Sequence, residues 1–211
     1  MEINKKEQTI WNIFAEREKL TPQQLELFQK YAYMLIEWNK KFNLTAITGL
    51  QEIVTKHFID SLALRKYVDL NNVKSIGDIG AGAGFPGVPL NIVYPDLGVI
   101  LIEVNHKKIQ FLEALIAQLG LKNIEICDLD WRTFLRKTES EVEYFVSRAT
   151  MDPAELCRMF KPSCPYKNSK LVYWATSKFE IDKKLQEFVL DTKEYSLGYA
   201  DRKLIFFGLK K

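Results

Sequence analysis

The sequence predicts an α/β fold, in which a mostly parallel sheet carries helices on both faces and follows an N-terminal helical extension. Two observations predict it. From residue 73 onward, short apolar stretches typical of buried strands alternate with longer stretches of helical periodicity. Residues 1–70 instead carry apolar side chains at helical spacing. We therefore divide the chain into the extension, residues 1–70, and a core domain, residues 71–211.

The composition is that of an ordinary globular protein. Of the 211 residues 47% are apolar and 27% are charged, enough for a substantial core. The formal net charge is only +3, so a surface that binds nucleic acid must be local. Cys127, Cys157 and Cys164 are scattered without metal-ligand spacing, and no apolar run approaches the length of a membrane span. We expect a cytoplasmic protein without a signal peptide, metal site or membrane span.

Capping signals define two helices of the extension. Thr21 is placed as an N-cap, with Pro22 at the first helical position and Gln24 three residues later. Thr48 and Gln51 repeat this spacing. The apolar stripe of the first helix consists of Leu25, Phe28, Ala32 and Leu35, and the second helix runs through Ile53, His57, Ser61 and Leu64.

Side chains of these two helices have alternative interpretations. Trp38 and Phe42 are four residues apart and either pack in a helix seam, which we favour, or stack on bases. His57 and Ser61 share a helical face and can hydrogen-bond each other. The alternative is a network between extension and core, or a rim for RNA, built from Asn39, Asn43, His57 and Asp60.

A glycine-rich turn follows the first expected strand, residues 73–79, with glycines at 80, 82, 84 and 87. Glycine tolerates positive φ and lets a ligand approach the backbone, so this arrangement is typical of a nucleotide-like ligand site. Residues 82–87 match a dinucleotide pattern, but they lie too far beyond the strand and include Pro86, which lacks an N–H. Asp78 followed by alternating glycines fits S-adenosylmethionine better, because a carboxylate repels pyrophosphate and attracts an ammonium group.

The stretch DIGAGAGFPGVPL, residues 78–90, resembles the cofactor motif of the bacterial 16S ribosomal RNA guanine-N7 methyltransferases, the glucose-inhibited division protein B family. Residues 38–45 and 57–62 are similar to N-terminal signatures of that family, and Arg202 agrees with it. The resemblance implies a Rossmann-like methyltransferase fold with seven strands and S-adenosylmethionine as cofactor. It also implies small-subunit ribosomal RNA, or a ribosomal particle, as partner.

The remaining elements follow in order. We expect strands at residues 99–103, 123–128, 142–146 and 171–175, and a helix from Lys107 that ends near Gly120. Two antiparallel strands, residues 189–199 and 202–209, close the sheet.

Two of these strands end in charged residues that belong to the predicted site. Glu103 lies 25 residues beyond Asp78, near the distance at which an acid meets the ribose in nucleotide-binding units. Arg148, in the family's Ser-Arg-Ala, is expected to contact guanine O6 or the methionine moiety of the cofactor, with a surface salt bridge as the alternative. Together these assignments make Arg148 catalytic and predict substrate contacts from Asn39, His57 and Lys178. Cofactor contacts are predicted from Gly80, Gly82, Phe85, Glu103, Trp131, Arg132 and Arg148.

Two segments depart from the family. Asp130, Trp131 and Arg132 replace Arg-Ala-Glu where the fold holds adenine, so we expect backbone contacts there, with added stacking by Trp131. Residues 175–177 replace Leu-Lys-Gly after the fifth strand, and Lys178 is displaced by two positions.

Guanine N7 carries a free lone pair, so its methylation needs positioning and no general base. We expect a monomeric methyltransferase acting on guanine N7 of small-subunit ribosomal RNA. A small-molecule methyltransferase, which the weak net charge favours, is one alternative. A non-catalytic RNA-binding or assembly protein, suggested by the two departures, is the other. RNA is expected on a basic patch of Lys40, Lys41, Arg65, Lys66 and Lys178.

Overall fold

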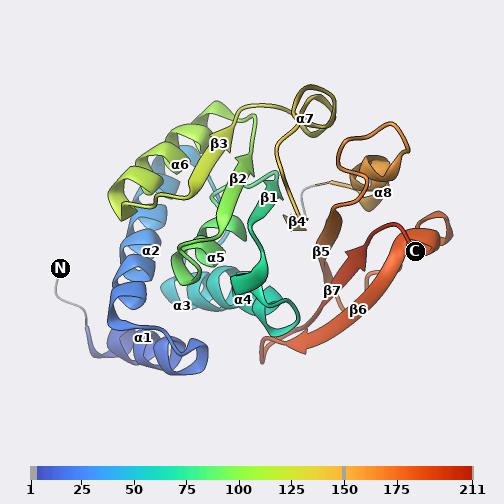
Figure 1. The fold of residues 1–211 in the computed structure, drawn as a ribbon. Helices are drawn as coiled ribbons and strands as arrows, with labels where there is room; N and C mark the ends of the chain where they lie inside the picture. The colour runs from blue at the N-terminus through green and yellow to red at the C-terminus, as the bar shows by residue number, and fades with distance from the viewer. Residues whose placement is uncertain (1–3, 149–150, 211) are drawn as a thin grey trace.

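The computed structural model describes residues 4–148 and 151–210, and its centre is a seven-stranded sheet (Figure 1). The strand order is β3-β2-β1-β4-β5-β7-β6. The β5–β7 and β6–β7 pairs are antiparallel and the other pairs are parallel. The strands are β1 (Ser75–Ile79), β2 (Gly98–Ile102), β3 (Ile124–Cys127), β4 (Tyr144–Arg148), β5 (Lys170–Thr176), β6 (Val189–Ser196) and β7 (Asp201–Phe207). The predicted mostly parallel sheet with an antiparallel closing hairpin is confirmed.

Strand β1 lies inside the sheet, and the strands that follow it in sequence are added on both sides of it. This strand pairs with β2 on one side and with β4 on the other. Open α/β sheets bind ligands at such a switch point, beyond the carboxyl ends of the strands. The glycine-rich turn follows β1 at this edge, and β4 ends there with Arg148.

The N-terminal part is helical, as predicted. Helices α1 (Lys5–Glu18) and α2 (Pro22–Phe42) precede a continuous helical segment. This segment consists of α3 (Leu50–Glu52), a π-helical turn (Ile53–Ile59), α4 (Asp60–Leu62) and a 3-10 turn (Ala63–Lys66). The capping box of Thr21 and Gln24 is confirmed. The second one is wrong: Gly49 is the N-cap of α3, and no side chain caps that helix.

The other helices lie on both faces of the sheet. They are α5 (Gly87–Val93), α6 (His106–Leu119), α7 (Trp131–Lys137) and α8 (Pro153–Leu156). Figure 1 shows α2 beside α6 on one side of the sheet and α7 and α8 on the other. Short 3-10 turns occupy Leu70–Asn72, Cys157–Phe160 and Lys183–Phe188.

Strand periodicity divides the interior into two cores. Along β2, Val99 and Leu101 belong to the first core, and Ile100 and Ile102 belong to the second. The second core contains side chains of α7 and α8. The first contains the fully buried aromatic side chains of α1 and α2, which are Trp11, Phe14, Phe28 and Tyr31. The extension therefore shares a continuous core with the sheet.

Candidate functional site

The glycine-rich turn combines a packed side with an open side. Gly80, Gly82 and Gly84 have φ of 65°, 62° and 96°, in the left-handed region. A Cβ on Gly84 would lie 2.8 Å from the Tyr31 hydroxyl, so this glycine allows α2 to approach. A Cβ on Gly82 would have the Gly80 carbonyl oxygen, 3.8 Å away, as its nearest protein atom beyond its own neighbours. The turn is therefore held from the α2 side and leaves room at Gly82.

Asp78 supports the turn from inside. Its side chain is buried, and Oδ2 accepts a hydrogen bond of 2.7 Å from the Gly87 N–H at the start of α5. The other oxygen, Oδ1, has no hydrogen-bond partner among the described residues. Burial raises the pKa of this carboxyl to about 7. Asp78 thus connects the end of β1 to α5.

Glu103 follows β2 and contacts the same turn. Its Oε2 accepts from the Gly82 N–H at 2.9 Å, and Oε1 accepts from the N–H groups of Val104 and Asn105 at 3.0 Å each. The Lys108 ammonium group lies 3.8 Å from Oε2. These contacts hold the Glu103 carboxylate against Gly82 of the turn, and its predicted contact with a ribose stays a prediction.

Phe85 is the centre of an aromatic stack behind the turn. Its ring lies 4.3 Å from that of His57 and 5.2 Å from that of Tyr31, both nearly parallel to it. The Arg148 guanidinium lies 5.0 Å from the Phe85 ring centre. The Tyr31 hydroxyl donates to the Ala83 carbonyl. Through this stack α2, the π-helical turn and β4 all support the glycine-rich turn.

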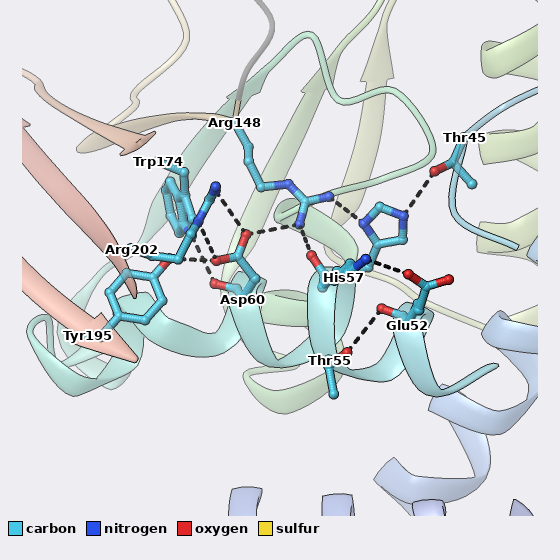
Figure 2. Close-up of polar contacts among 10 residues, drawn as sticks. Thr45, Glu52, Thr55, His57, Asp60, Arg148, Trp174, Tyr195 and Arg202 are labelled. Carbon is cyan, nitrogen blue, oxygen red and sulfur yellow. Dashed lines mark hydrogen bonds and ion pairs between the residues drawn. The ribbon is translucent and has the colours of Figure 1, made fainter. Parts of the chain in front are cut away.

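Asp60 is the centre of a buried polar network (Figure 2). Its carboxylate accepts a 2.6 Å hydrogen bond from the Tyr195 hydroxyl. It also forms ion pairs with Arg148 at 3.3 Å and Arg202 at 3.4 Å. The Trp174 indole N–H donates to the Asp60 carbonyl at 2.9 Å. The network joins the N-terminal helical segment to β4, β5, β6 and β7.

Arg148 and His57 extend this network toward the turn. Arg148 donates to the Lys56 carbonyl at 3.0 Å and to His57 Nδ1 at 2.9 Å. His57 Nε2 lies 3.1 Å from the Thr45 hydroxyl. The Arg148 side chain is only 12% exposed, so the surface-salt-bridge alternative is wrong.

The network between extension and core is confirmed for His57 and Asp60. The predicted His57–Ser61 hydrogen bond is wrong, because both ring nitrogens of His57 have other partners. Asn39 bonds the backbone of Thr45 twice, through its amide oxygen at 2.8 Å and its amide nitrogen at 2.9 Å. It therefore shapes the segment that presents Thr45 to His57.

The contacts of His57 require a neutral ring, because Nδ1 accepts from a guanidinium that can only donate. Burial, together with the charges of Arg148 and Lys56, lowers the pKa of His57 to about 3. The unfolded chain therefore binds a proton on His57 below about pH 6.5 that the folded chain rejects. The neutral state of His57 therefore costs no unfolding free energy above about pH 6.5. Below that pH, the unfolding free energy falls steadily as the pH drops toward 3.

We expect His57→Gln to flatten the fall in unfolding free energy between pH 6.5 and 3, by up to about 1.4 kcal/mol per pH unit. Urea denaturation at a series of pH values measures this slope. His106→Gln, which removes the exposed histidine at the start of α6, is the matched control and should keep the wild-type slope. Equal slopes for the two variants would contradict the buried, neutral state of His57.

Other predicted contacts lie outside this cluster. The Trp131 ring is buried against Phe134 and Phe145, and its N–H donates to the Glu155 carbonyl at 3.2 Å. Arg132 is exposed and pairs with the Glu155 carboxylate at 2.7 Å. Lys178 is exposed in the turn after β5. A contact of these three residues with cofactor or RNA stays a prediction.

Neighbouring side chains compensate part of the charge of the predicted basic patch and pack against the aromatic rings that were considered for base stacking. Arg65 is bound to the buried Glu18 carboxylate at 3.0 Å, and its charge is compensated there. Lys40 pairs with Glu37 at 2.7 Å. Trp38 packs against Phe42 and against Phe111 of α6, with ring centres 5.4 and 5.6 Å away, which confirms the helix-seam interpretation.

Sequence reasoning missed Tyr195, Trp174, Thr45 and Tyr31. Tyr195 and Trp174 lie in strands, where the sequence pattern predicts that a side chain is buried but not which group it will contact. Their hydroxyl and indole N–H groups both bond to Asp60. Within residues 4–148 and 151–210, no helix is both long and apolar enough to cross a membrane, and no three potential metal ligands cluster.

Comparison with known protein families gives one coherent result. The family model described as rRNA small subunit methyltransferase G matches residues 24–201. The relative from Staphylococcus epidermidis is 51% identical over 114 residues, which cover 51% of this chain and 48% of that protein. The one from Bacillus subtilis is 44% identical over 130 residues, 62% of this chain and 54% of that protein. Both carry the name ribosomal RNA small subunit methyltransferase G, and the chain spans about half of their length.

Solved structures support the fold. A methyltransferase from Aquifex aeolicus, described as SAM dependent, has a TM-score of 0.54 at 16% identity, covering 74% of this chain and 93% of that one. A mutant of MtNAS in complex with S-adenosylmethionine has a TM-score of 0.56 at 14% identity, covering 88% and 73%. These likenesses show a Rossmann-like fold of the kind found in S-adenosylmethionine-dependent methyltransferases.

Proposed function

The chain belongs to the rRNA small subunit methyltransferase G family, and from this premise we propose that it methylates guanine N7 in small-subunit (16S) ribosomal RNA, with S-adenosylmethionine as methyl donor. One observation carries the proposal. At the sheet's switch point, the open side of Gly82 and the carboxylate of Glu103 meet, joined by the 2.9 Å bond between them. This arrangement suits a ligand that offers ribose hydroxyls and no phosphate.

The described residues fit the cofactor. Glu103 would accept hydrogen bonds from the ribose hydroxyls, and such bonds to a charged acceptor contribute about 1.5–3 kcal/mol each. Gly80 and Gly82 would let the methionine moiety approach the backbone, with Phe85 holding the turn in shape. The backbone at Trp131 and Arg132 would border the adenine. When bound, the cofactor supplies a methyl group activated by its positively charged sulfur.

The chain's own contribution is to orient the guanine. No proton has to leave N7, so positioning provides the rate enhancement. Arg148 is the catalytic candidate, because its guanidinium lies at the carboxyl end of β4 and is fixed by Asp60, His57 and the Lys56 carbonyl. A guanidinium held in this way can donate to guanine O6, or to the carboxylate of the cofactor. Asn39, His57 and Lys178 are the proposed substrate contacts.

We further propose that the protein acts as a monomer in the cytoplasm. Large apolar side chains that are exposed in the described part of the chain are few and come from separate segments: Ile13, Val104, Leu190, Tyr199 and Leu209. Five exposed apolar side chains offer little of the contiguous apolar surface that a stable dimer needs.

Methyl transfer from labelled S-adenosylmethionine tests the function. The chain is incubated with small ribosomal subunits, with free small-subunit RNA and with a metabolite extract. We expect label in RNA, recovered as N7-methylguanine after digestion. Label only in the metabolite fraction would favour a small-molecule methyltransferase, and RNA binding without transfer would favour a non-catalytic RNA-binding or assembly protein.

A further inference from the structure

A cationic pocket lies between α7 and the 3-10 turn that follows α8. Its volume is about 420 Å³, and four of the residues that line it are basic: Arg132, Arg136, Arg158 and Lys161. All four side chains are exposed. Leu135, Cys164 and Pro165 contribute apolar surface to the same pocket. The formal net charge of the whole chain is only +3, so this pocket is a strong local concentration of positive charge.

The charge of this cationic pocket is only partly compensated. The Glu155 carboxylate pairs with Arg132 at 2.7 Å and with Arg158 at 3.0 Å. Among the described residues, neither Arg136 nor Lys161 forms an ion pair. Glu155 therefore holds two cations in place and leaves two for an external anion. A guanidinium and an ammonium group at one pocket can each pair with one singly charged phosphate of a nucleic-acid backbone.

The pocket extends from the first turn of α7 to the segment 161–165, which leads toward the start of β5. Helix α7 begins a few residues after β3 ends, and α8 follows β4, so both start near the ligand-binding edge of the sheet. The bond from the Trp131 indole N–H to the Glu155 carbonyl joins the two helices. In Figure 1 they lie across the sheet from α1 and α2.

We propose that the cationic pocket binds the phosphate backbone of the RNA substrate. The inference rests on the proposed function. Two unpaired cations take the phosphates, and the apolar surface from Leu135, Cys164 and Pro165 accommodates the sugar between them. This places a further RNA contact on α7 and the 3-10 turn, outside the predicted patch of Lys40, Lys41, Arg65, Lys66 and Lys178.

The double variant Arg136→Ala/Lys161→Ala tests the proposal. Its affinity for a transcript of small-subunit ribosomal RNA is measured at several salt concentrations. Each lost contact with a single strand lowers the steepness of log K against log salt by about 0.7, so we expect a reduction of about 1.4 together with weaker binding. Affinity for S-adenosylmethionine should stay unchanged, because neither side chain is a predicted cofactor contact.

Lys183→Ala/Lys184→Ala is the matched control, since it removes the same charge from exposed positions after β5. A wild-type slope in Arg136→Ala/Lys161→Ala, or an equal reduction in both double variants, overturns the pocket as the RNA site. Methyl transfer by the wild-type chain is measured in parallel. If the slope falls as expected without any transfer, the pocket is supported and the proposed function fails. If transfer occurs and the slope is unchanged, the function is supported and the pocket proposal fails.

Discussion

Replacing Asp60 with alanine is expected to destabilise the protein by about 3–5 kcal/mol and to abolish methyl transfer. The cost is high because the substitution leaves the guanidinium groups of Arg148 and Arg202 in a largely buried environment without their counter-ion. It also removes the acceptor of the Tyr195 hydroxyl. Urea denaturation measures the stability, and labelled methyl incorporation at a temperature where the variant is folded measures the activity.

Glu37→Ala is the control for this substitution. It removes a carboxylate that forms an exposed ion pair with Lys40, both side chains being more than 60% exposed. Exposed pairs of this kind contribute about 0–1 kcal/mol, so stability and transfer should stay close to wild type. Similar losses in Asp60→Ala and Glu37→Ala would contradict the central role of Asp60.

Gly82→Val is expected to weaken S-adenosylmethionine binding at least a hundredfold, about 2.7 kcal/mol. The valine side chain would point into the space beside Glu103 that the cofactor is proposed to occupy. It would also be strained at a φ of 62°, which lowers stability by about 1–3 kcal/mol. Calorimetric titration with the cofactor, after the fold has been checked by circular dichroism, measures the effect.

Gly120→Val separates strain from occlusion. Gly120 follows α6 at a φ of 64°, and a Cβ there would meet nothing within 4 Å. This variant should lose similar stability and keep its cofactor affinity. If Gly82→Val folds and binds the cofactor like wild type, the turn is not part of the cofactor site.

Local sequence signals predicted most of the fold. Apolar stretches, the glycine-rich turn and the antiparallel ending located every strand within a few residues. These signals depend on neighbours three or four positions away. The same capping-box signal was present at Asn4 and Glu7, where the structure has the box and the prediction did not include it.

Tertiary contacts account for what the sequence did not predict. The π-helical turn at Ile53–Ile59 has no local signature, and it presents His57 to Arg148, 91 residues away. Similarly, Asp60 and Tyr195 are 135 residues apart, and only the strand order brings them together. Charge patches are also tertiary: Arg65 belongs to a basic pair in the sequence and is compensated in the structure by Glu18, from a different helix.

The residues of the Asp60 network are synthesised at very different times, so the network can be completed only late in synthesis. Tyr195 and Arg202 come from the last hairpin, so the ribosome delivers them long after Asp60 and Arg148. Contacts of such high sequence separation must also close a long loop, which slows their formation. A nascent or truncated chain without β7 still contains the glycine-rich turn but lacks Arg202, one of the two cations paired with Asp60. Formation of the complete Arg148–Asp60–Arg202 cluster is thereby coupled to synthesis of the β6–β7 hairpin.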